Sequence, residues 1–171
     1  MRSLIDRLVA ARIGQTTNFY REGRGARIRR ERVEAYLEAR NGAEWLLVGE
    51  APGYRGARVS GIPFTSERQL TGAGPAEATA TIVHRVLAEL GLTEQVLLWN
   101  VVPTHPGTAT SNRAPTRGEV AQGRAFADEL ARGRRVIAVG RIAHTALGGT
   151  YARHPSHGGA PAFAATLREL L

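Results

Sequence analysis

Hydrophobic residues recur at two spacings along this chain, and the two spacings alternate. Short continuous apolar runs at 45–49, 96–102 and 136–140 predict strands that are buried on both faces. Apolar positions at helical spacing predict helices at 3–12, 28–40, 75–90 and 141–147, and a terminal helix that begins at Pro161. Thr116, followed three residues later by Glu119, predicts a capped helix that ends near Gly133. Polar or glycine-rich loops are expected at 13–26, 50–74 and 148–160.

This alternation implies an α/β fold with a mainly parallel sheet that helices cover on both faces. The length of 171 residues suits one domain over 1–171, with one hydrophobic core and one site. Ligands of such sheets bind beyond the carboxyl ends of the strands. The loops that start at Gly49, Asn100 and Gly140 are therefore expected to converge on the site.

The charge balance favours a polyanionic partner. The chain has 23 basic and 15 acidic residues, which give a formal net charge of +8, and every basic residue is an arginine. Arginine forks suit phosphate oxygens. Genome base composition is an equally good explanation of an arginine-rich, lysine-free chain. The arginines at 21, 24, 27, 29, 30 and 32 fit either a contact surface for phosphates or a solvated helix face.

Two missing residue types exclude whole classes of chemistry. Without lysine, no side chain supplies a Schiff-base amine, a phosphate-loop lysine or a pyridoxal anchor. Without cysteine, there is no disulfide, iron–sulfur cluster, thiolate zinc site or cysteine nucleophile. No run is long and apolar enough to cross a bilayer, and the first 15 residues do not resemble a signal peptide. A cytoplasmic protein is expected.

Polar side chains at the strand ends are the first candidates for chemistry. Glu50 follows the first strand, where a carboxylate is suited to orient a water or to stabilise a developing cation. The alternative is that Glu50 caps a loop or pairs with an arginine. Asn100 closes the second strand and offers a donor and an acceptor in one plane, which reading the edge of a pyrimidine requires. A buried asparagine that pins two loops together is the alternative.

Loop residues supply the other candidates. His105, His154 and His157 lie in predicted loops, whereas His84 and His144 fall on predicted helices and are expected to be structural. A neutral imidazole is suited to donate to a base carbonyl while negative charge builds on it. His154 and His157 lack the spacing of a helical zinc motif, so no metal site is predicted.

An aromatic residue in the loop after the first strand has two interpretations. Phe64 lies in the middle of this glycine-rich loop, where a ring is suited to stack on a base. A phenylalanine in such a loop also commonly covers the edge of a core.

Taken together, these segments resemble the uracil-DNA glycosylase superfamily, and most closely its thermophile-type family 4 branch. The segments that carry the resemblance, in chain order, are LLVGEAPG at 46–53, GIPF at 61–64, LLWNVVPTHPG at 97–107, NRAPT at 112–116, VIAVGR at 136–141 and HPS at 154–156. The resemblance implies a three-layer α/β/α fold around a mainly parallel four-stranded sheet.

The resemblance also implies a role for each matching position. The loop with Gly49 and Ala51 would wrap a flipped base, and Glu50 would assist the hydrolytic water. Phe64 would stack on uracil, Asn100 would read its edge and His154 would donate to its O2. The residues implied to contact DNA are Arg113, Ser156, His157 and Gly158.

The reaction implied is monofunctional, cofactor-free hydrolysis of the N-glycosidic bond of uracil or another deaminated base in DNA. The expected partner is DNA that contains such a base, and a monomer is expected. The chain departs from the iron–sulfur branch because it lacks the four cysteine ligands, so no iron–sulfur cluster is expected.

A second departure lies after Gly53. The acidic run of that branch is replaced there by Tyr54-Arg55-Gly56-Ala57-Arg58, which leaves Glu50, Glu67 or a backbone-held water for catalysis. Tyr54 is a candidate for restricting the pocket against the methyl group of thymine.

Two other functions remain open from the sequence. One is a glycosylase-like protein that binds damaged or single-stranded DNA with little turnover, which the missing acidic run would explain. The other is an unrelated α/β hydrolase or nucleotide-binding protein, against which stands the absence of a phosphate loop, a GxGxxG and a Gly-x-Ser-x-Gly elbow.

Overall fold

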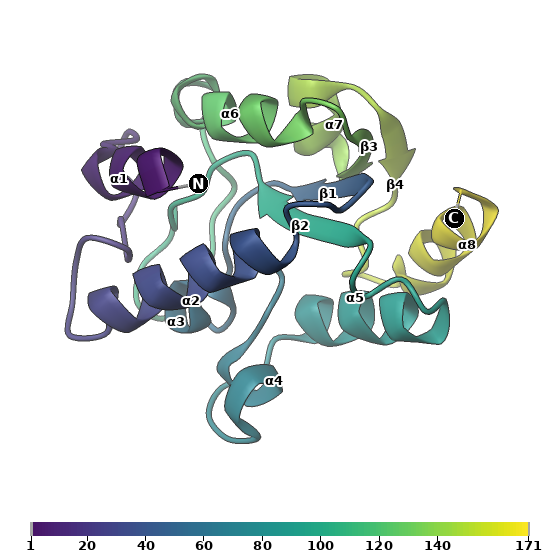
Figure 1. Cartoon of the computed structure of the whole chain (residues 1–171), viewed down its shortest axis with the longest axis horizontal. Helices are drawn as coiled ribbons and strands as arrows, with labels where there is room; N and C mark the ends of the chain where they lie inside the picture. Colours follow the sequence, from purple (N-terminus) through teal and green to yellow (C-terminus); the bar gives the residue numbers. More distant parts are fainter. Residues whose placement is uncertain (1, 171) are drawn as a thin grey trace.

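Four parallel strands form one sheet at the centre of the molecule (Figure 1). The structure is a computed structural model that describes residues 2–170. The strands are β1 (Trp45–Gly49), β2 (Val96–Asn100), β3 (Arg135–Val139) and β4 (Thr150–Ala152), and they lie in the order β2-β1-β3-β4. The expected parallel four-stranded sheet is confirmed.

Helices precede, connect and follow these strands. They are α1 (Arg2–Ala10), α2 (Ala26–Ala39), α3 (Ala57–Ser60), α4 (Glu67–Thr71), α5 (Ala78–Glu89), α6 (Arg117–Ala131), α7 (Arg141–Leu147) and α8 (Ala160–Leu170). Within residues 2–170, none of these helices is long and apolar enough to span a membrane.

The side chains of β1 alternate between two hydrophobic clusters. Leu46 and Val48 pack into a cluster with residues of α1, α2, α6 and α7. Trp45 and Leu47 face the other way, into a cluster with residues of α5 and α8. All five residues of β1 are buried, and this burial on both faces explains the continuous apolar run. The sheet is thus the middle of three layers, as expected.

The strand order brings the ends of β1, β2 and β3 together. Gly49 and Asn100 are register partners at the carboxyl ends of β1 and β2. The connections leave β1 and β3 in opposite directions across the sheet, so the topological switch point lies between these two strands. A Cβ placed on Gly140, directly after β3, would lie 3.5 Å from Glu50 Oε1 and 3.7 Å from His154 Cβ. The three predicted loops therefore do converge.

The predicted cap of α6 is also confirmed. The Glu119 backbone N–H donates to Thr116 Oγ1 at 3.2 Å, and the Thr116 N–H donates to Glu119 Oε2 at 2.8 Å. This reciprocal pair satisfies two backbone donors that the start of a helix leaves unpaired.

The start of α5 differs from the prediction. Pro75 does not begin the helix, because its carbonyl accepts a hydrogen bond from the Arg68 N–H at 3.2 Å and the chain folds back on α4. The helix begins instead at Ala78, with Glu77 at the N-cap position. This shift of three residues moves Glu77 from the first turn of a helix to the boundary of the loop.

The two loops expected at 50–74 and 148–160 contain regular structure. The first contains the short helices α3 and α4. The second contains β4, which pairs in parallel with β3 and whose Ala152 carbonyl accepts from the Gly140 N–H at 2.9 Å. The terminal helix begins at Ala160, one residue before the predicted Pro161.

Candidate active site

A pocket of about 420 Å³ opens at the carboxyl end of the sheet. Most of the residues predicted from the sequence line it: Gly49, Glu50, Ala51, Phe64, Asn100, Arg113, His154, Ser156 and His157. Two predicted residues, Tyr54 and Gly158, are absent from the lining. The Tyr54 N–H donates to Asn112 Oδ1 at 2.8 Å, which ties the loop after β1 to the segment before α6.

Asn100 is a buried polar side chain left without a protein partner. The residue is only 3% exposed, and its carboxamide forms no hydrogen bond to any of residues 2–170. The only fully buried side-chain nitrogen or oxygen without a partner in residues 2–170 is Trp99 Nε1, so the polar atoms of Asn100 stay accessible from the pocket that it lines and are free to pair with a ligand. The carboxamide can donate and accept at one edge of a planar ligand.

Phe64 and Asn100 meet over Gly49, at the end of β1. A Cβ on Gly49 would lie 2.4 Å from Phe64 Cζ and 3.0 Å from Asn100 Oδ1, so this position excludes any side chain. Phe64 itself has a φ of 52°, in the left-handed region that residues other than glycine rarely adopt. Such backbone strain persists only where the surroundings impose it.

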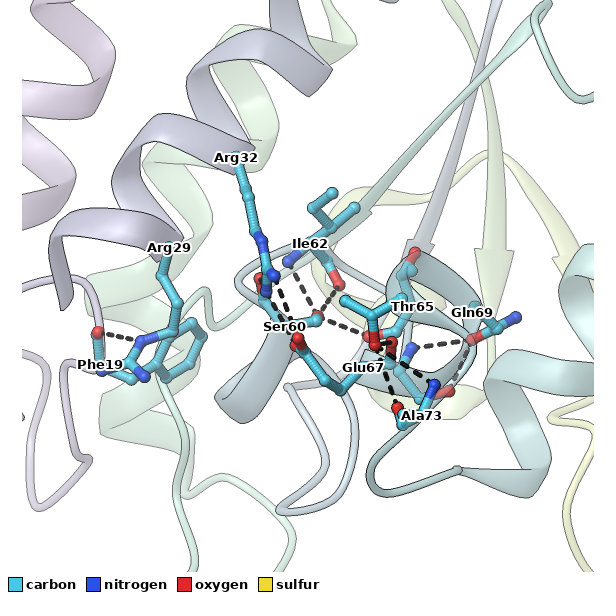
Figure 2. A network of polar contacts seen from close by, with 11 residues as sticks. Phe19, Arg29, Arg32, Ser60, Ile62, Thr65, Glu67, Gln69 and Ala73 are labelled. Carbon is cyan, nitrogen blue, oxygen red and sulfur yellow. Dashed lines mark hydrogen bonds and ion pairs between the residues drawn. The ribbon is translucent and has the colours of Figure 1, made fainter. Parts of the chain in front are cut away.

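A polar network imposes that turn (Figure 2). The Ser60 hydroxyl donates to the Thr65 carbonyl at 2.6 Å and accepts from the Ile62 N–H at 3.1 Å. Thr65 Oγ1 lies 3.0 Å from His84 Nε2 on α5. His84 therefore has the structural role expected for it, and hydrogen bonds to the residues before and after Phe64 fix the turn that carries its ring.

The hydrogen bonds of His154 select one tautomer. The Ser156 N–H lies 3.2 Å from His154 Nδ1, and Ser156 Oγ lies 2.7 Å from the same atom. Since a backbone N–H can only donate, Nδ1 accepts and the neutral ring carries its proton on Nε2. Burial and the nearby His157 lower the pKa of His154. The ring is therefore set as a neutral donor through Nε2.

Two carboxylates line the pocket, and neither has an ion-pair partner among residues 2–170. Burial raises the pKa of Glu50 and also that of Glu77. A raised pKa with no compensating charge is typical of groups that act on a ligand or a proton.

Glu77 is the residue that the sequence did not point to. Its carboxylate lies against the backbone of the loop after β1, where a Cβ on Gly53 would be 2.1 Å from Oε1 and one on Gly56 would be 1.7 Å from Oε2. The two glycines thus make room for this carboxylate. The three-residue spacing of Gly53 and Gly56 is the only sequence feature that indicates a close approach here. It does not identify Glu77 as the side chain that approaches.

The other acid considered for catalysis lies outside the pocket. Glu67 is the first residue of α4 and forms a two-pronged pair with Arg32, with Nη1–Oε2 at 2.8 Å and Nη2–Oε1 at 3.0 Å (Figure 2). Its carboxylate is neutralised there, so the structure replaces Glu67 with Glu77 as the second acid of the pocket.

Arg113 borders the pocket but is bound to a carboxylate. Its guanidinium forms two short bonds to Glu119, Nη2–Oε1 at 2.6 Å and Nη1–Oε2 at 2.7 Å. The side chain remains 37% exposed, which leaves part of the guanidinium open to solvent. The predicted contact of Arg113 with a phosphate stays a prediction.

His105 is a buried link between loops. Its Nδ1 lies 2.7 Å from the Pro52 carbonyl and its Nε2 lies 2.8 Å from the Thr108 carbonyl. These contacts fix the loop after β1 against the segment after β2. His157, in contrast, is exposed at the pocket rim and has a φ of 51°.

The arrangement suits hydrolysis of a planar, polar ligand. It provides a ring for stacking, an amide and an imidazole N–H for the ligand edge, and two carboxylates for water or a developing cation. Within residues 2–170, no three His, Asp or Glu side chains gather as metal ligands.

Comparison with known proteins gives a family and a fold. The profile described as "Uracil DNA glycosylase superfamily" matches residues 38–167. Among solved structures, the chain is similar to "The crystal structure of WT Pedobacter heparinus SMUG2", with a TM-score of 0.67, 14% identity, and coverage of 99% of this chain and 97% of that one. At this identity, the structural likeness shows the fold. No curated protein matches the chain.

Proposed function

This chain belongs to the uracil DNA glycosylase superfamily, and from that membership we propose that it is a monofunctional DNA glycosylase that starts base excision repair. Its proposed substrate is uracil, or another deaminated base, flipped out of DNA into the pocket at the carboxyl end of the sheet. The observation that carries the proposal is Asn100, a residue only 3% exposed whose carboxamide faces the pocket and has no hydrogen-bond partner among residues 2–170.

The base would be held by stacking and by its polar edge. Phe64 supplies the ring face, and the strained backbone at this residue presents it toward Gly49 and Asn100. Asn100 would accept from the ring N–H of uracil and donate to the adjacent carbonyl. His154 would donate its Nε2 proton toward the other carbonyl of the base.

These contacts strengthen as the bond breaks. Cleavage of the bond between the sugar C1′ and the base nitrogen leaves its electron pair on the base and positive charge on the sugar. A neutral imidazole N–H and an amide N–H then face a growing anion, and a preorganised donor is worth about 3–4 kcal/mol in a transition state. Water adds to C1′ and releases a proton, so the products are the free base and an abasic sugar.

The water requires a carboxylate to orient it and accept its proton. Glu50 is the proposed group, because it lies at the switch point beside Gly140 and His154. Glu77, on the Gly53 and Gly56 side of the pocket, is the proposed second carboxylate, which stabilises the charge on the sugar. Neither group is neutralised by an arginine of residues 2–170, although the chain has a net charge of +8.

The rim would contact the DNA around the flipped nucleotide. Ser156, His157 and Gly158 form the turn after His154, and two of these residues have a positive φ. In the proposed complex this turn enters the minor groove and supports the gap that the flipped base leaves. Arg113 would face a phosphate with the part of its guanidinium that Glu119 leaves open. Tyr54 does not line the pocket, so a restriction against thymine by this residue would have to come from the loop after β1 that it belongs to.

The proposal is tested with end-labelled oligonucleotides that contain one uracil, either single-stranded or opposite guanine or adenine. We expect strand cleavage only after alkali treatment, because a lysine-free enzyme leaves an abasic site without a Schiff base. Hypoxanthine and xanthine substrates rank the lesions in the same assay. Binding without cleavage of any substrate would favour the alternative function, a glycosylase-like DNA-binding protein with little turnover.

A further inference from the structure

A second hollow, of about 400 Å³, lies on the other side of α3 from the active site. The first residue of α3, Ala57, lines the active-site pocket, whereas Arg58 and Val59 line the hollow. Arg24 and Arg29 lie on the opposite wall, Arg24 in the segment that leads into α2 and Arg29 within the first turns of that helix. Three guanidinium groups from two distant parts of the sequence thus share one depression.

The positive charge of this arginine hollow is uncompensated. The guanidinium groups of Arg24 and Arg58 form no hydrogen bond or ion pair with any of residues 2–170. The hollow has one carboxylate, Glu22, and this carboxylate is bound to Arg21 at 2.6 Å. Two neighbouring arginines of α2 are paired with carboxylates instead, since Arg27 binds Glu31 and Arg32 binds Glu67.

Arg29 is held rigidly without being neutralised. Its Nε donates to the Phe19 carbonyl at 2.6 Å, as Figure 2 shows, and its Nη2 donates to the Glu22 carbonyl at 2.8 Å. A Cβ on Gly25 would lie 2.6 Å from Nη1, so glycine leaves room for the guanidinium there. Burial and the charge of Arg58 lower the pKa of Arg29. The fold therefore brings like charges together where an anion would offset their repulsion.

We infer that the arginine hollow is a phosphate-binding site separate from the active-site pocket. Guanidinium groups bind phosphate oxygens through paired N–H donors, and the partly buried position strengthens such bonds. Arg29 is preordered, with Nη1 open, while Arg24 and Arg58 close on the anion from two sides. The hydroxyl of Thr17, which has no partner among residues 2–170, is a fourth donor on the wall.

The source of the phosphate that fits best is the DNA backbone, and this part of the inference rests on the proposed function. The two hollows share α3, and Thr17 is paired with His105, whose ring contacts the Pro52 carbonyl in the active-site loop. A strand whose flipped nucleotide occupies the pocket would therefore pass its flanking phosphates along this side of the molecule. Inorganic phosphate would supply the same chemistry.

The test removes the two arginines of the hollow whose guanidinium groups form no hydrogen bond or ion pair within residues 2–170. The double variant Arg24→Gln/Arg58→Gln is compared with Arg85→Gln/Arg124→Gln, which removes two exposed arginines paired with Glu89 and Asp128. Both variants have the same net charge. The affinity for an undamaged oligonucleotide is measured by fluorescence anisotropy over a range of salt concentrations, and circular dichroism checks the fold.

The expected result is a smaller salt dependence for the hollow variant alone, with the slope of log Kd against log salt reduced by about 1 for one lost phosphate. An unchanged slope, together with saturable binding of inorganic phosphate that the hollow variant loses, would assign the site to a free phosphate. If the hollow and control variants bind both DNA and phosphate equally, the inference is wrong.

Excision assays separate this result from the proposed function. Uracil excision by the native chain, with no difference between the two variants in DNA or phosphate binding, would remove the inference and keep the function. If the native chain excises no base but the hollow variant still loses DNA affinity, the proposed function is wrong and the inference stands.

Discussion

Two buried asparagines show how differently this fold treats its structural and its ligand-facing polar groups. Asn18 is 2% exposed and Asn100 is 3% exposed. The Asn18 amide donates to the carbonyls of Leu8, Val9 and Ala11, and its Oδ1 accepts from the Tyr20 N–H. The Asn100 carboxamide has none of these bonds within residues 2–170. Two residues of similar overall burial thus differ in pairing, and the one whose carboxamide lines the pocket without a protein partner among residues 2–170 is the one available to a ligand.

Two glutamates, Glu119 and Glu50, show the same contrast between a paired and an unpaired polar group. Glu119 is 2% exposed, and its carboxylate accepts from Arg113, from the Thr116 N–H and from the Gln15 N–H. The bonds from Arg113, together with these backbone donors, lower its pKa to about 2. Burial without a partner moves the pKa of Glu50 in the opposite direction. The Arg113–Glu119 pair therefore stabilises the fold. The carboxylate of Glu50 is instead desolvated without a partner among residues 2–170, which leaves it free to bind a ligand or accept a proton.

The largest effect is expected from the two side chains proposed to hydrogen-bond the base, Asn100 and His154. Asn100→Ala and His154→Ala each remove a donor to the developing base anion, so single-turnover excision should fall about a hundredfold to a thousandfold. DNA affinity should stay nearly intact, because phosphate contacts supply most of it. Single-turnover rates and anisotropy on the same preparations check this prediction, and a matching loss of DNA affinity would sink the assignment.

The two acids of the pocket should differ in their effect. Glu50→Gln removes the group proposed to accept the proton of water and should slow excision about a hundredfold, toward the lower end of general-base effects. Glu77→Gln should cost less. Since burial raises both pKa values, the native rate should fall as the pH drops toward these raised values, and each variant should flatten part of that acid limb. Equal rates for both variants and the native chain would remove the carboxylates from the mechanism.

The structural asparagine should behave in the opposite way to Asn100. Asn18→Ala leaves buried carbonyls and the Tyr20 N–H without partners, which should lower the free energy of unfolding by about 2–3 kcal/mol. Excision measured well below the melting temperature should stay at the native rate. Urea unfolding of Asn18→Ala and Asn100→Ala, side by side, checks the contrast, and it fails if Asn100→Ala is the less stable variant.

The smallest effect concerns pH and the Arg113–Glu119 pair. The folded pKa of Glu119 is depressed to about 2 from its ordinary value of 4.5, so the stabilisation is complete above pH 4.5 and is lost as the pH falls toward 2. We expect a loss of roughly 2 kcal/mol, reduced by solvent screening of the partly exposed Arg113. Urea unfolding from pH 6 to pH 2 measures it. Glu119→Gln should show a shallower decline, and an identical decline would contradict the assignment.

The sequence predicts the frame of the site well, because the frame depends on local signals. The apolar run at 45–49 is β1 itself, and the Thr116–Glu119 pair does cap α6. Glu50 and Asn100 follow from their places at strand ends and His154 from its place in a predicted loop, and all three line the pocket.

The features that the sequence did not give depend on tertiary contacts. β4 has three residues, two of them exposed, so it has no hydrophobic pattern and exists only because it pairs with β3. The sequence places Glu77 inside a helix because proline commonly begins one. In the structure the Pro75 carbonyl instead accepts from the Arg68 N–H, and Glu77 lies at the loop boundary. The sequence likewise cannot tell that Arg24, Arg29 and Arg58 lack a carboxylate partner within residues 2–170, because this depends on which acidic side chains the fold brings near them.

The central claim, that this pocket hydrolyses the glycosidic bond of a deaminated base, is tested most directly by detecting the free base. The native chain, in excess over a single-stranded oligonucleotide with one uracil, is incubated, and the products are separated by mass spectrometry. The account predicts free uracil and an uncut abasic strand from the native chain, and at least a hundredfold slower release from Asn100→Ala. Release at equal rates from both proteins, or a strand cut without alkali, would contradict it.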